Sequence, residues 1–85
     1  MPTSSEFRRT LQIAFAGANL QQLPHLDVNA GDLHRLVGDY PGPNNRMPVC
    51  CDVMYQEFAD GDVILEAPPK GKGASLTIRY QIPRH

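Results

Sequence analysis

Residues 75–82, SLTIRYQI, alternate between polar and apolar side chains without a break. This period of two is typical of a β-strand with one face in the core, and it turns four apolar side chains inward: Leu76, Ile78, Tyr80 and Ile82. The stretch before it reads VILEAPPKGKG, a second extended run followed by prolines, glycines and two lysines. Two short strands joined by a glycine-containing turn predict a β-hairpin. On the first strand, the side chains of Val63, Leu65 and Ala67 are expected to lie on the same face. Because a hairpin alone is only marginally stable in water, the rest of the chain has to cover its inner face.

The first half of the chain predicts two helices with a short strand between them. The first helix begins near Thr3 or Ser4, where TSSE has the form of a capping box, and it ends before Pro24. Its buried stripe at helical spacing consists of Phe7, Leu11, Ala14, Phe15 and Ala18. The segment HLDVN, residues 25–29, is expected to form a strand beside the hairpin and so complete a three-stranded sheet. A short second helix follows, with Asn29 as its N-cap, Gly38 at its C-terminal end, and a buried face of Leu33, Leu36 and Val37.

A turn rich in proline, glycine and asparagine, DYPGPNNR, leads into a third helix over about residues 45–58. Asn45 is expected to cap this helix, which puts Pro48 in the first turn, where its missing N–H has no cost. The apolar face is expected to contain Met47, Cys50, Cys51, Met54 and Phe58. The other face is expected to contain Arg46, Val49, Asp52, Val53 and Gln56.

The length of 85 residues and the hydrophobic content of 41% fit one globular domain, residues 1–85, with a single small core. No apolar run approaches the ~20 residues that a membrane span requires, and the first ten residues lack the apolar segment of a secretory signal. We therefore expect a cytoplasmic protein that does not insert into a membrane.

The cysteines and histidines indicate neither a disulfide nor a metal site. Cys50 and Cys51 are neighbours, so a bond between them would close no loop, and both are expected to be reduced and buried in the third helix. No CxxC pair is present and the histidines have no recognisable ligand spacing to the cysteines, so no metal or cofactor is expected. His34 is expected at or near the surface. Since no paired carboxylates and no nucleophile–base spacing stand out, a non-catalytic protein is expected.

The charge of the chain is unevenly distributed. The net charge is −1, yet residues 27–66 contain eight acidic and two basic side chains. Residues 67–85 contain no acid and four bases, Lys70, Lys72, Arg79 and Arg84. A cationic region of this kind on a chain of nearly zero net charge points to a local contact with an anion, and the alternative is a solvated turn.

The order helix, strand, helix, turn, helix and terminal hairpin, with a glycine-lysine hairpin tip, resembles the winged helix-turn-helix family over about residues 4–83. The resemblance implies an α+β fold of three helices with a C-terminal β-hairpin wing. In that family the third helix usually enters the major groove of DNA, and the wing usually lies on the phosphate backbone or in the minor groove. By position, the recognition helix here would be residues 45–58 and the wing tip residues 68–73.

The resemblance predicts a double-stranded DNA partner and a set of contact residues. Asn44, Asn45 and Arg46 would stand at the positive N-terminal end of the recognition helix, where they could reach bases or phosphates. Lys70, Lys72 and Arg79 would contact phosphates, which position a protein without reading sequence. Such a domain would act as a small transcriptional regulator or as a targeting module.

Two departures from the family pattern favour an alternative function. The turn before the third helix is longer than the ~3–4 residues of a tight helix-turn-helix. In addition, the third helix carries Asp52 and Glu57 and a single base. The alternative is a winged-helix-like module that binds a protein partner or a second copy of itself, through the acidic stretch 52–66 and a patch of Val49 and Val53.

Overall fold

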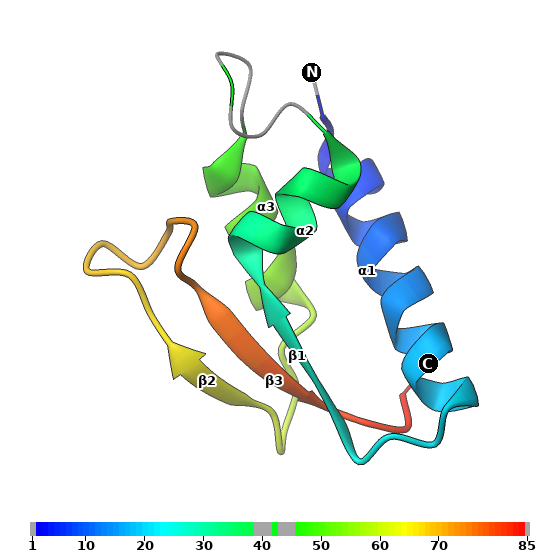
Figure 1. Cartoon of the computed structure of the whole chain (residues 1–85). Helices are drawn as coiled ribbons and strands as arrows, with labels where there is room; N and C mark the ends of the chain where they lie inside the picture. Colours follow the sequence, from blue (N-terminus) through cyan, green and yellow to red (C-terminus); the bar gives the residue numbers. More distant parts are fainter. Residues whose placement is uncertain (1, 39–41, 43–45, 85) are drawn as a thin grey trace.

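The computed structural model describes residues 2–38, 42 and 46–84. Its elements in chain order are α1 (Ser4–Leu20), β1 (His25–Asn29), α2 (Ala30–Val37), α3 (Met47–Gln56), β2 (Val63–Glu66) and β3 (Thr77–Gln81). In this part of the chain, three helices accompany a three-stranded antiparallel sheet with the strand order β1-β3-β2 (Figure 1). The expected α+β architecture and element order are therefore present.

The last strand, β3, is the centre of the sheet. β1 pairs with it from His25 opposite Gln81 to Asn29 opposite Thr77, and β2 pairs with its other edge. The predicted alternation of β3 is confirmed, because four side chains are buried at intervals of two: Leu76, Ile78, Tyr80 and Ile82. The predicted alternation of β2 is wrong, since a bulge between Ile64 and Glu66 interrupts the register and all four of its residues are exposed.

Helix α1 contributes two phenylalanines to the helical side of the core. Its N-cap is Thr3, whose side chain accepts a hydrogen bond from the Glu6 backbone N–H at 3.3 Å, as the sequence predicts. The stripe of Phe7, Leu11, Phe15 and Ala18 is buried. The rings of Phe15 and Tyr80 meet edge to face with centroids 4.9 Å apart, so α1 packs directly on the central strand.

Helix α2 begins at the predicted cap, but its buried face is rotated from the predicted one. His34 is fully buried, and Leu36 is 74% exposed. The reason lies at the start of the helix, where the N–H groups of Ala30 and Gly31 donate to the carbonyls of Leu76 and Ala74. This junction holds the first turn against the base of the hairpin, which turns position 34 inward and position 36 outward.

Helix α3 is shorter than predicted and more deeply buried. Arg46 is its N-cap residue, the predicted cap Asn45 lies outside the described residues, and Pro48 occupies the first turn as expected. Val53 is fully buried instead of facing outward, because α3 lies between the other helices and the hairpin loop and buries a wide arc. Phe58 is 40% exposed, since the helix ends at Gln56 and no longer directs it inward.

None of the helices in the described ranges is long and apolar enough to cross a membrane.

Candidate nucleic-acid interface

The loop that joins β2 to β3, residues 67–76 and hereafter the hairpin loop, is fastened to the side of α3. The Tyr55 hydroxyl donates to the carbonyl oxygen of Gly71, and the Cys51 thiol donates to the carbonyl oxygen of Gly73 at 3.4 Å. A third contact joins Lys72 Nζ to Asp52 Oδ1 at 2.6 Å. Three successive loop residues thus contact three residues of α3, and the loop and the helix form one continuous surface.

Gly71 and Gly73 allow the loop to turn back on itself beside α3. Gly71 has a φ of +82°, in the left-handed region that favours glycine. A Cβ on Gly73 would come within 3.2 Å of the Pro68 side chain. The alternation of lysine and glycine in the sequence therefore has a structural reason, in addition to any role of the charges.

Arg46 lies at the N-terminal end of α3. Its backbone N–H donates to Nε2 of the buried His34 at 2.8 Å, which ties the start of α3 to α2. In this contact His34 Nε2 is the acceptor. The contact holds the N-terminal end of α3, with Arg46 as its N-cap residue, against α2.

Lys70 and Lys72 differ in their surroundings. Lys70 is exposed at the loop tip, and no carboxylate in the described ranges lies within ion-pair distance of it. Lys72 is paired with Asp52, whose hydrogen bond and charge raise the pKa of the Lys72 ammonium above its usual value. Both side chains of this pair remain about half exposed, so the pair is open to exchange with an external anion.

Arg79 is not brought together with the other predicted cations. It lies on the outward face of β3 and donates to Asp27 of β1 through Nε at 2.8 Å and Nη2 at 3.1 Å. This bidentate pair lowers the pKa of the Asp27 carboxyl. Asn44 and Asn45 lie outside the described residues. Of the six predicted contact residues, Lys72 contacts α3 directly, Arg46 is the N-cap residue of α3, and Lys70 lies in the hairpin loop.

Sequence reasoning placed Asp52 on the outer face of α3 but missed two contacts of that face. The first is the ion pair of Asp52 with Lys72. One turn further along the same face, Arg8 of α1 donates to the Gln56 side chain. No sequence signal connects residues 8 and 56, because the contact depends on how α1 packs across α3.

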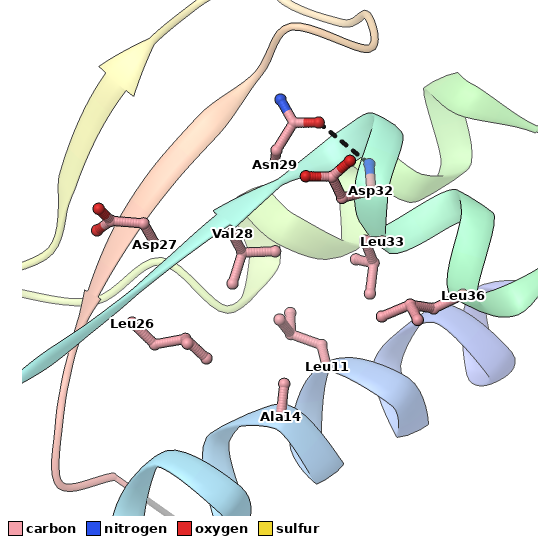
Figure 2. Close-up of a pocket in the computed structure, with 9 residues that line it drawn as sticks. All are labelled: Leu11, Ala14, Leu26, Asp27, Val28, Asn29, Asp32, Leu33 and Leu36. Atoms are coloured by element: carbon pink, nitrogen blue, oxygen red, sulfur yellow. Dashed lines mark hydrogen bonds between the residues drawn. The ribbon is translucent and has the colours of Figure 1, made fainter. Parts of the chain in front are cut away.

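A shallow pocket of about 170 Å³ lies elsewhere, between α1, β1 and α2. Figure 2 shows its apolar side chains, such as Leu11 and Leu33, pointing toward one another, while Asp27, Asn29 and Asp32 point away. These polar groups already have structural roles. Asp27 pairs with Arg79, Asn29 caps α2, and Asp32 pairs with Arg35 at 2.9 Å. They do not converge on the pocket as the polar groups of a small-molecule site do.

Within the described ranges, no group of three histidine, cysteine or acidic side chains is arranged to hold a metal ion. Both cysteines are buried free thiols, as predicted. Comparison of the chain with protein-family models, curated proteins and solved structures found no match. The case for a function therefore depends on the geometry and charge of the surfaces described above.

Proposed function

We propose that this chain is a non-catalytic winged-helix domain that binds duplex DNA through the phosphate backbone. It would serve as a small transcriptional regulator or as the targeting module of a larger assembly. The observation that supports this proposal is the fastening of the hairpin loop to α3, because a winged-helix protein presents these two elements to DNA together. We propose that Arg46 at the N-cap of α3 and Lys70 and Lys72 of the hairpin loop contact the phosphates from this surface.

The exposed residues of α3 favour phosphate contact over base reading. The described part of the helix offers Pro48, Asp52 and Gln56 to a partner, and a carboxylate in that position repels phosphate. Gln56 is already the acceptor of the Arg8 hydrogen bond. We therefore propose a weak, largely sequence-independent interaction carried by three cations, with tight binding requiring a second domain or a second copy.

Salt dependence tests this proposal directly. Each phosphate neutralised contributes about −0.9 to the slope of log K against log salt, so three contacts give a slope of roughly −3. Fluorescence anisotropy with labelled duplexes of unrelated sequence, at low ionic strength, should show binding that differs little between sequences. Replacing both Lys70 and Lys72 by alanine should weaken binding to every duplex to a similar extent and reduce the slope by about 2 units.

Arg79→Ala is the matched control, because it removes a cation of the same hairpin that lies on the outward face of the sheet. It should leave both the affinity and the salt slope unchanged. An unaltered anisotropy on addition of duplex at low salt contradicts the proposal, as does an equal loss of binding in Arg79→Ala.

A protein-binding module remains the second candidate, on a different surface from the one that the sequence indicates. The predicted patch of Val49 and Val53 does not exist as such, because Val53 is fully buried. The acidic stretch, in contrast, contains an exposed apolar strand, β2. Affinity for a peptide at that strand, with no affinity for duplex DNA, would favour this candidate.

A further inference from the structure

Strand β2 forms one edge of the sheet and has an unusual composition for that position. It pairs with β3 on one side, and within the described ranges no strand pairs with its other side. Three consecutive large apolar side chains are exposed, at 49% for Val63, 41% for Ile64 and 44% for Leu65. Natural edge strands are commonly guarded by charged residues, proline, a bulge or short length. β2 contains no lysine or proline, and its guards are Glu66, the bulge and its length of four residues, which leave the apolar triplet itself uncovered.

An exposed edge strand of this kind can accept an additional strand. The backbone N–H and C=O groups on the outer side of a β-strand can form a ladder with an extended peptide, whose alternate side chains then lie beside those of the edge. The bulge at Leu65 and the length of four residues limit the ladder to a few hydrogen bonds. Such a contact is expected to be weak and reversible.

The charges around β2 indicate the chemistry of the occupant. Residues 57–66 contain four carboxylates and no base. Within the described part of the chain, Asp62 alone among these four has an ion pair, with Arg84. Asp60 and Glu66 are exposed on either side of the apolar triplet. An extended segment with alternating apolar residues would pack against the apolar side chains of β2. Lysine or arginine at its two ends would pair with the two flanking carboxylates.

A second copy of the chain suits this edge less well. Antiparallel pairing of β2 with β2 of another molecule would bring Asp60 of one copy toward Glu66 of the other at each end of the pair, and like charges across paired strands are destabilising. We propose that the outer edge of β2 is a docking site for an extended, apolar segment of another protein with basic flanks, added to the sheet as a fourth strand. This proposal does not depend on DNA binding, because β2 and the α3 surface are separate.

The test uses the whole chain labelled with ¹⁵N and a blocked synthetic peptide, Lys-Thr-Val-Thr-Val-Thr-Val-Thr-Lys. We expect amide shift changes centred on residues 60–66, slower amide hydrogen exchange in β2, and a dissociation constant of about 0.1–1 mM. The same peptide with glutamate in place of both lysines should bind roughly fivefold more weakly or not at all, since two exposed ion pairs become repulsions.

Two variants with the same chemical change separate this site from a general apolar effect. Leu65→Lys places a guarding charge on the edge and should abolish the peptide-induced shifts. Ile13→Lys makes the equivalent change at a 62% exposed position of α1 and should leave peptide binding intact. Thermal unfolding of both variants should match that of the unmodified chain, which shows that each has folded.

Three outcomes would overturn the proposal. The first is the absence of shift changes in residues 60–66 at millimolar peptide, and the second is shift changes confined to another surface. The third is a concentration-dependent dimer in sedimentation that Leu65→Lys dissociates, because this result assigns the edge to a second copy. A failure of duplex binding has no bearing on any of these readouts.

Discussion

Asp62 and Arg84 join the two ends of the hairpin: Arg84 Nη1 donates to Asp62 Oδ1 at 2.9 Å, with the carboxylate 1% exposed and the guanidinium side chain 16% exposed. Asp62 also accepts from the backbone N–H groups of Gln81 and Ala59, at 2.7 and 2.8 Å. The same guanidinium donates to the Glu57 carbonyl oxygen at 2.7 Å. It also lies 4.7 Å from the centroid of the Phe15 ring. The pair therefore connects the C-terminal end of α3, the hairpin and α1.

Asp62→Asn should destabilise the domain by about 3 kcal/mol, because removing one partner of a buried ion pair leaves the other charge uncompensated. For a domain of this size, the midpoint of thermal unfolding should fall by more than about 10 °C. Asp60→Asn makes the same change at an exposed position two residues earlier and should alter stability by no more than about 0.5 kcal/mol. Calorimetry or circular dichroism melts measure both, and equal midpoints for the two variants would contradict the assigned role of Asp62.

The same carboxylate predicts an acid limit to stability. Burial by itself raises the pKa of Asp62, but the hydrogen bonds from Arg84, Gln81 and Ala59 outweigh it, and the net pKa is lowered. The native state then holds its proton less tightly than the unfolded chain, whose carboxyl has a pKa of about 4. The stabilisation is therefore complete above about pH 5 and is lost as the pH falls through the lowered native pKa. Urea unfolding between pH 7 and pH 2 should show this decline, and Asp62→Asn should flatten it.

The two thiols are expected to be inert in the folded protein. Burial, together with the neighbouring Cys51, raises the pKa of the Cys50 thiol to about 12, and burial also raises the pKa of the Cys51 thiol. Since the thiolate is the reactive form, Cys50 at neutral pH has a thiolate fraction about a thousandfold below that of an exposed cysteine. Reaction with a disulfide reagent should be slow in the native protein and should reach both thiols in denaturant. Rapid reaction of either thiol under native conditions would show that α3 opens locally.

The residues that sequence patterns located correctly are those whose surroundings are local. The alternation of residues 75–82 predicts burial correctly because the inner face of the strand is covered and its outer face is not. Thr3 and Asn29 are predicted correctly because each caps the helix that begins directly after it. His34 and Leu36 were misassigned because hydrogen bonds between the start of α2 and residues 74 and 76 rotate the helix. Periodicity within α2 contains no information about contacts made some forty residues away.

The candidate site shows the same division between local and distant information. The sequence identified the cationic loop, but the pairing of Lys72 with Asp52 and of Arg79 with Asp27 depends on tertiary contacts over 20 and 52 residues of chain. The sequence analysis also divided α3 into one buried and one exposed face, as if a single side of the helix were covered. Val53 is buried because α3 is covered from more than one side, which a single-helix pattern does not record.

Asp52 should limit the affinity of the α3 surface for DNA. Its carboxylate pairs with Lys72 and therefore competes with phosphate for that cation. Asp52→Asn removes a carboxylate that repels phosphate, and it also releases Lys72 from its ion pair. Duplex binding should therefore become several-fold tighter. The salt slope should stay at roughly −3, because Lys72 is already one of the three proposed phosphate contacts and the variant adds no further cation.

Asp27→Asn is a closely matched comparison, because it also removes one carboxylate from an exposed ion pair and changes the net charge by the same amount. The base it releases, Arg79, lies on the outward face of the sheet. If DNA binds the surface of α3 and the hairpin loop, Asp52→Asn strengthens binding and Asp27→Asn does not, in parallel anisotropy titrations at several salt concentrations. Equal gains in both variants would mean that net charge alone governs the interaction, and a gain confined to Asp27→Asn would move the DNA to the outer face of the sheet.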